Sequence, residues 1–344
     1  MIIGTLGSPS RARVDARGSL TAERARWELD WWIGAEDRRH VPADEAAVRQ
    51  TRLGAAPVAQ TAMRVPGGDA VQRVYAVGGR DDVVVMEVEN ASPVPFAVGF
   101  VARGRPELLL PRPPLRREPD DGGEVLVYPV AHRTVRRIAV SLGARSSSVE
   151  VDALPGADSV VRGWEAQLGR GMRVELPDER VQRAVDAARA DALLERDAAA
   201  LEDWGFDDEA ATAWASLSFR GRRRARRRPA RPPGWDDVEA LLDGTGAGFL
   251  LALRSVLVHE AGDTISLLAK LPSSWRGGNL EVHEAPTRAG GRVSYAVRWH
   301  GERPALLWEV ERAGVRLRAP ALDPEWSTTE RRGEALLAPA NAAV

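Results

Sequence analysis

The chain of 344 residues has no cysteine, which excludes disulfides, thiolate nucleophiles and cysteine-ligated zinc. Lysine occurs once, at Lys270, so nearly every basic residue is an arginine. The longest apolar stretch, residues 247–258, contains Arg254 and is shorter than the roughly 20 residues that a membrane-spanning helix needs. The first residues lack the basic start and the apolar run of a secretory signal. We therefore expect a cytoplasmic protein without a membrane partner.

The chain also lacks an overall excess of charge, with a formal net charge of −1, but its arginines are unevenly spread. Eight of them lie within residues 220–231, and the rest of the chain carries 40 basic and 49 acidic residues. Arginine matches phosphate geometry, but this run contains no aromatic side chain on which a base could stack. Pro229, Pro232 and Pro233 stop a helix there. We predict an arginine-rich linker at residues 220–233, and nucleic acid is the least favoured partner.

Residues 1–165 are predicted to form an N-terminal antiparallel β-sandwich. Short runs rich in valine and aromatic residues recur about every ten residues and are separated by Gly, Pro and Asn, as in sandwiches. Residues 90–95 suit a hairpin turn between two strands. Residues 112–123 are polar and rich in Pro and Gly, which predicts a loop at the end of a sheet.

The periodicity then changes to that of helices, and we assign residues 166–258 to a short helical region that includes the linker. Asp178 lies in the first turn of a helical run, where the helix dipole favours an acid. Gly205 ends the run in the left-handed conformation, and Asp207 can cap the next helix. A short turn between two such helices predicts a helical hairpin.

The remaining residues, 259–344, return to the pattern of strands. Val293, Tyr295, Val297 and Trp299 alternate with smaller or polar residues, the period of a half-buried strand. We therefore predict a smaller C-terminal antiparallel β-domain. The fold class predicted for the whole chain is α+β, with a sandwich, a short layer of helical hairpin and a second β-domain.

This order of parts resembles the bacterial six-hairpin glycoside hydrolases, such as the glucoamylase-like, glycogen-debranching-like and rhamnosidase-like enzymes. The residues that carry the resemblance are 30–50 and 87–98 in the N-terminal part, 200–214 in the helical part and 280–311 in the C-terminal part. In that family an (α/α)6 toroid lies between two β-domains. The resemblance implies a carbohydrate-active protein whose general acid and base would be carboxylates in the funnel of the toroid.

The length of the helical part limits what the resemblance can imply. A six-hairpin toroid needs at least roughly 190 residues, and the chain offers about 90 between its β-parts. Most of the toroid is therefore absent, and an acid–base pair has no place to be held at the separations of glycoside hydrolysis. We predict a reduced, glycoside-hydrolase-like protein that binds or acts on a saccharide. The alternative is a non-enzymatic assembly protein that kept only the scaffold, and a homo-oligomer is left open.

Tryptophan is frequent, with 11 residues against 3 tyrosines and 5 phenylalanines, and sugar rings stack on indoles. Neighbouring tryptophans on a strand point to opposite faces, so one of Trp31 and Trp32 is expected in the core and the other available to a ligand. The candidates for saccharide binding are Asp30, Trp31, Trp32, Arg39, His40 and Trp204. Catalytic residues are not assigned. If a carboxylate does act on sugar, the candidates are Asp30, Asp203, Asp207, Asp208 and Glu209, although helix-end electrostatics also explain the last four.

The sequence predicts neither a metal nor a cofactor. The five histidines form no H-E-x-x-H motif and no pair at i, i+4, which disfavours a zinc hydrolase. His283 and Glu284 are adjacent, so on a strand they point to opposite faces. The glycines of residues 244–249 follow a helical stretch rather than a strand, which indicates a turn and not a dinucleotide-binding loop.

Overall fold

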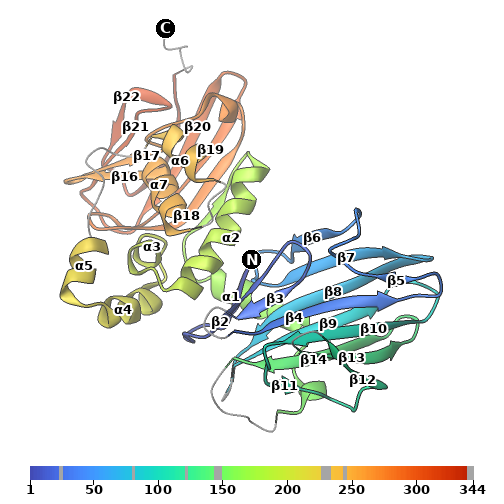
Figure 1. Ribbon diagram of the computed structural model, residues 1–344. Coiled ribbons are helices and arrows are strands. Elements are labelled where there is room, and N and C mark those ends of the chain that lie inside the picture. The colour runs from blue at the N-terminus through green and yellow to red at the C-terminus, as the bar shows by residue number, and fades with distance from the viewer. Residues whose placement is uncertain are drawn as a thin grey trace. The chain divides into compact units, whose positions relative to one another are not determined.

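The computed structural model describes residues 1–22, 26–79, 82–120, 123–142, 149–225, 234–242 and 246–338 (Figure 1). These residues form largely antiparallel sheets, one of which contains a parallel strand pair, together with seven α-helices, and this confirms the predicted α+β class. The chain divides into two compact units, Met1–Glu165 and Ala166–Val344, which we call the first and the second unit.

The first unit is an antiparallel β-sandwich, as the recurring apolar runs predict. One sheet has the order β1-β2-β3-β4-β10-β13-β12, with β5 paired to β4. Its strands are β1 (Ile2–Gly4), β2 (Arg11–Val14), β3 (Leu20–Ala22), β4 (Glu28–Gly34), β5 (Arg39–His40), β10 (Phe96–Arg103), β12 (Arg116–Asp120) and β13 (Gly123–Val130). The other sheet has the order β11-β14-β9-β8-β7-β6. Its strands are β6 (Arg49–Arg52), β7 (Ala59–Val65), β8 (Gly68–Val77), β9 (Val83–Asn90), β11 (Leu108–Leu109) and β14 (Val135–Ser141).

The core of the sandwich consists of the inward-facing residues of both sheets. Leu29 and Phe100 come from one sheet and Val74 and Met86 from the other, and all four are fully buried. Burial of this apolar surface is the dominant favourable contribution to folding. Strand β4, which carries Leu29, alternates between buried and half-buried residues, as a period of two requires, whereas β9 and β10 are buried along most of their length.

Two predicted connections of the sandwich are wrong. Residues 90–95 do not turn a hairpin, because β9 and β10 belong to different sheets and the segment crosses between them. The Asn90 side-chain amide holds this crossing by donating to the carbonyls of Val94 (2.9 Å) and Val130 (3.1 Å). Residues 112–123 are not all loop, because they contain the edge strand β12. An edge strand tolerates charged residues and proline, so its sequence looks like a loop.

The helices begin at the end of the first unit and continue through the second. They are α1 (Ala157–Leu168), α2 (Glu179–Glu195), α3 (Ala198–Asp203), α4 (Asp207–Ser216), α5 (Phe219–Ala225), α6 (Trp235–Leu241) and α7 (Ala247–Leu257). Gly205 has φ 74°, as predicted, and stands between the helices α3 and α4 of the hairpin. The predicted run before it is broken, because Arg196 is left-handed and Asp197 caps a new helix. Asp207 is a first-turn residue of α4 rather than its cap.

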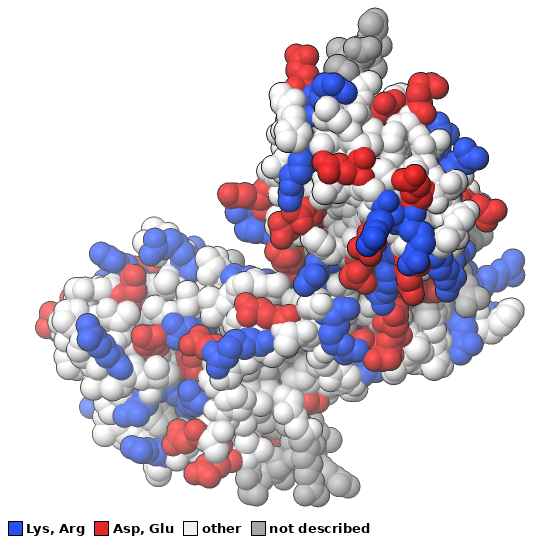
Figure 2. All heavy atoms as spheres, turned by 180° about the vertical axis from the view of Figure 1, so that it is seen from behind, with Lys and Arg blue, Asp and Glu red and all other residues white. Residues whose placement is uncertain are grey.

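The arginine-rich run begins in helix α5. Arg220, Arg222 and Arg223 lie in this helix, while residues 226–233 of the predicted linker are outside the described part of the chain. Figure 2 shows basic and acidic side chains interspersed over the face that it presents. Among the described helices, none is both long enough and apolar enough to cross a membrane.

The second unit contains two sheets besides its helices. One has the order β15-β18-β19-β20-β23 and the other the order β16-β17-β21-β22. The strands are β15 (Arg173–Glu175), β16 (Val258–Ala261), β17 (Thr264–Leu267), β18 (Leu280–Thr287), β19 (Gly291–His300), β20 (Arg303–Val310), β21 (Arg316–Ala319), β22 (Asp323–Thr328) and β23 (Arg332–Leu336). Strand β15 precedes helices α2 to α7 in the sequence yet pairs with β18. In the second of these sheets, β17 and β21 pair in parallel, whereas the neighbouring pairs are antiparallel. The division of residues 166–344 into a helical and a β-domain at residue 258 stays a prediction.

Candidate functional site

The two neighbouring tryptophans of β4 point to opposite faces of their sheet, as expected. Trp31 is 2% exposed and belongs to the core of the sandwich, and its Nε1 donates to the carbonyl of Arg17 (3.1 Å). Trp32 lies on the outer face and is half-buried. Trp31 therefore cannot contact a ligand in this structure, and Trp32 is the tryptophan of the pair that remains a candidate.

The indole of Trp32 is covered by its own neighbours. It lies against Gly99 of β10, where a Cβ atom would collide with the ring. The Arg39 guanidinium lies over the ring, with its Cζ 4.2 Å from the ring centroid. Nε1 of Trp32 is buried and finds no acceptor among the described residues. A sugar can stack on this indole only if Arg39 moves.

The other polar groups of this surface are paired with each other. Asp30 accepts a hydrogen bond from Arg103 at 3.0 Å across the β4–β10 pair. Beside them, Val101 and Val125 form a small apolar cluster on the same outer face, against which Trp32 packs. Asp30, Trp32 and Arg39 thus lie on one outer face, where Asp30 is paired with Arg103 and Arg39 lies over Trp32.

His40 lies between two carboxylates at the end of the β4–β5 hairpin. Its ring nitrogens are 3.0 Å from Glu45 and 3.0 Å from Asp37, and the imidazole is buried. The hydrogen bond with His40 lowers the pKa of Asp37. The hydrogen bond from Arg38 (2.5 Å) is the main cause that lowers the pKa of Glu45. This arrangement fixes the hairpin and leaves neither ring nitrogen free for a ligand.

The candidates from the helical part also have structural partners. Trp204 is fully buried in the second unit, and its Nε1 donates to the carbonyl of Leu250 (3.0 Å). The acids that follow it each meet an arginine: Asp207 is 2.6 Å from Arg292, and Arg170 lies 2.8 Å from both Asp208 and Glu209. Asp203 is likewise not free of partners. Arginine pairing explains this acidic cluster without a catalytic role.

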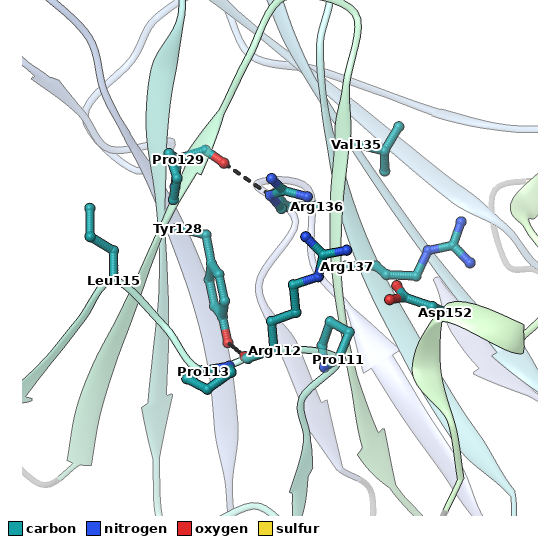
Figure 3. Close-up of a pocket in the computed structure, with 10 residues that line it drawn as sticks. All are labelled: Pro111, Arg112, Pro113, Leu115, Tyr128, Pro129, Val135, Arg136, Arg137 and Asp152. Atoms are coloured by element: carbon teal, nitrogen blue, oxygen red, sulfur yellow. Dashed lines mark hydrogen bonds between the residues drawn. The ribbon is translucent and has the colours of Figure 1, made fainter.

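A pocket of about 500 Å³ lies elsewhere in the first unit, and the sequence did not predict it (Figure 3). Four pieces of chain enclose it: the β11–β12 connection, strand β13, strand β14 and the short helix η1 (Val151–Ala153). Its polar residues are Arg112, Tyr128, Arg136, Arg137 and Asp152, and its apolar residues are Pro111, Pro113, Leu115, Pro129 and Val135. Charged and flat apolar side chains therefore share one concave surface.

The three arginines of the pocket differ in how their donors are used. Arg137 donates to the carbonyl of Leu154 (3.1 Å) and lies 3.3 Å from Glu87. Nε of Arg136 donates to the carbonyl of Pro129 (3.0 Å), so the two terminal nitrogens of this guanidinium remain as donors for a ligand. The Arg112 guanidinium has no hydrogen bond or ion pair among the described residues, and in Figure 3 it extends upward past the Tyr128 ring toward Arg136.

Tyr128 fixes the floor of the pocket. Its hydroxyl donates to the backbone carbonyl of Arg112 (2.9 Å), so the ring positions the residue whose side chain carries the unpaired charge. Burial raises the pKa of the phenol, which keeps it protonated as a donor. The ring also meets Phe100 edge to face, with centroids 6.1 Å apart, and this ties it to the core.

Comparisons of the chain with protein-family models, with curated proteins and with solved structures found no match. The resemblance to six-hairpin glycosidases thus stays a prediction from the sequence.

Proposed function

We propose that the chain is a non-catalytic saccharide-binding protein, a reduced relative of six-hairpin glycosidases, and that the pocket of the first unit takes an acidic sugar. The observation that carries this proposal is the coexistence, in one pocket of about 500 Å³, of apolar side chains and arginine donors that have no partner in the described part of the chain.

The size and chemistry of the pocket support a sugar with one anionic group. Its volume is in the range of pockets that hold small molecules. Proline rings and the edge of Tyr128 offer apolar surface to the C–H faces of a pyranose. Arg112 and Arg136 offer guanidinium donors, which pair with a carboxylate or phosphate by charge-assisted hydrogen bonds. Asp152 can accept from sugar hydroxyls.

The arrangement of carboxylates supports binding without hydrolysis. Glycoside hydrolases place two carboxyl groups on opposite sides of the scissile bond, about 5–9.5 Å apart. Among the described residues that line the pocket, Asp152 is the one carboxylate. Asp207, Asp208 and Glu209 are each paired with an arginine and belong to the second unit. Their pairing with arginine favours a structural role for these three acids.

Isothermal titration of the chain with neutral maltooligosaccharides, with oligogalacturonates and with glucose 1-phosphate tests the proposal. We expect an acidic ligand to bind, at least tenfold loss of affinity in Arg112→Gln, and no product in a reducing-sugar assay. Arg49→Gln is the matched control, because Arg49 is exposed on β6 and is not a pocket residue. Absence of binding, or equal loss in both variants, would refute the pocket assignment, and turnover would refute the non-catalytic one.

One observation favours nucleic-acid contact as a second candidate function. Phe219 is 83% exposed at the start of α5, directly before Arg220 and the arginine-rich run. An exposed aromatic ring beside cations is a feature of single-strand binding. Titration of labelled single-stranded RNA at low salt would test this, and we expect Phe219→Ala to weaken any such binding. No binding by the unaltered chain at low salt would remove this candidate.

A further inference from the structure

Three potential metal ligands lie together on the outer face of the five-stranded sheet of the second unit. Glu175 of β15 stands directly opposite Glu281 of β18, and His283 follows two residues later on the same face. One ligand atom from each of the three lies within 4.8 Å of the others. We propose that Glu175, Glu281 and His283 bind a divalent transition-metal ion, with zinc as the preferred ion.

The spacing of the donor atoms suits a metal of this kind. Nε2 of His283 and Oε2 of Glu281 are 2.8 Å apart. Two ligands of a tetrahedral zinc ion at bond lengths of about 2.1 Å are separated by about 3.4 Å, so the two atoms need to move apart by only roughly half an ångström. One imidazole and two carboxylates suit zinc better than magnesium or calcium, which favour sites made of oxygen alone. Three protein ligands leave a coordination position open to water or to a further group.

A neighbouring arginine orients the central ligand. Arg298 of β19 donates to Oε1 of Glu281, while Oε2 faces His283. Metal-binding carboxylates are commonly held in this way by a second hydrogen bond, which fixes the carboxylate before the ion arrives. Because β15, β18 and β19 are adjacent strands of one sheet, the ligands and this supporting residue stand on a rigid base.

The placement of Glu175 points independently to a cation. Like charges directly opposite each other on antiparallel strands destabilise a sheet. Arg298 bonds Glu281, whereas Glu175 has no ion pair among the described residues. Arg173, the nearest cation on β15, stands opposite His283 rather than Glu281. The described side chains compensate the repulsion between the two glutamates only in part. A divalent ion bound between them offsets the remainder.

The test uses the full chain without a histidine tag, treated with a chelator and dialysed. Titration with zinc chloride is expected to show one bound equivalent and a rise in melting temperature, and cobalt(II) to give a visible d–d absorption. His283→Ala and Glu175→Gln should each weaken zinc binding at least tenfold. His300→Ala, at the exposed end of β19, should leave it unchanged. Circular dichroism of each variant reports whether the fold is kept.

Several outcomes would overturn the assignment. They are no zinc binding, binding that His283→Ala and Glu175→Gln leave intact, or a preference for magnesium over zinc. Glu175→Gln is the decisive variant because Glu175 is exposed and the change keeps its shape, so its folding is not at risk.

Discussion

Two surfaces of the first unit carry similar residues but differ in whether those residues satisfy one another. On the β4–β5 surface, Asp30 pairs with Arg103 and Arg39 covers Trp32. In the pocket, the Arg112 guanidinium has no described partner, and only Nε of Arg136 is bonded. A charged group that already has a protein partner stabilises the fold and gains little from a ligand. An unpaired guanidinium beside apolar side chains can still form hydrogen bonds and an ion pair with a ligand.

The comparison teaches that residue type alone does not identify a binding surface. The segment of residues 30–40 contains aromatic, acidic and basic side chains, which is why the sequence draws attention to it. The structure shows that the same mixture builds a hairpin with its own internal pairing.

Substitutions on the two faces of β4 should differ strongly in how much they lower the free energy of unfolding. Trp31→Ala removes a fully packed indole and its hydrogen bond, and we expect a loss of about 3–5 kcal/mol of unfolding free energy. Trp32→Ala removes a half-exposed ring, and we expect about 1–2 kcal/mol. Urea unfolding followed by circular dichroism measures both. Equal losses would contradict the description of the Trp32 face as a surface.

Tyr128→Phe tests whether the pocket depends on the bond that holds Arg112. Loss of the 2.9 Å hydrogen bond should lower stability by about 1 kcal/mol and weaken acidic-sugar binding about fivefold. Tyr295→Phe is the matched control, since this buried phenol of the second unit also donates to a backbone carbonyl, that of Leu257 (2.8 Å). The control should lose similar stability without a change in affinity. An affinity loss in both variants would mean that the effect is not local to the pocket.

Local patterns predicted those parts of the fold that depend on neighbours in sequence. The alternation in residues 28–34 is enough to separate Trp31 from Trp32, and Gly205 marks the turn of the helical hairpin. The stop at Arg196 was missed, because a left-handed arginine carries no sequence signal of the kind that glycine gives. The strand within residues 112–123 was missed because polar edge strands resemble loops.

Neither the pocket nor the proposed metal site could be found in this way. The pocket combines the β11–β12 connection with β13, β14 and η1, and only the sheet topology brings these segments together. The histidine motifs typical of zinc sites have helical spacing, whereas Glu281 and His283 show the i, i+2 spacing of a strand. That pair was visible in the sequence. The third ligand, Glu175, comes next to this pair only because β15 pairs with β18.

The ion pairs around His40 should make the β4–β5 hairpin sensitive to acid. Because the pKa of Glu45 is lowered below 4.5 in the folded state, its stabilising effect is present above that value and is lost as the pH falls through the folded pKa. Glu45→Gln should cost about 1 kcal/mol or less at pH 7. Thermal melts from pH 7 to pH 3 should show this difference shrinking below pH 4.5. Glu36→Gln, on the same turn, is the control and should show no such trend.

Arg39→Ala gives the smallest effect and the most direct test of the contrast between the two surfaces. Removal of an exposed cation–π contact should lower stability by about 0.5–1 kcal/mol. Acrylamide should then quench tryptophan fluorescence more strongly, and this gain should vanish in a Trp32→Phe background. If the pocket is the sugar site, the uncovered indole leaves acidic-sugar affinity unchanged. A clear gain or loss of affinity would instead return the binding site to the β4–β5 surface, with Arg39 as its cover.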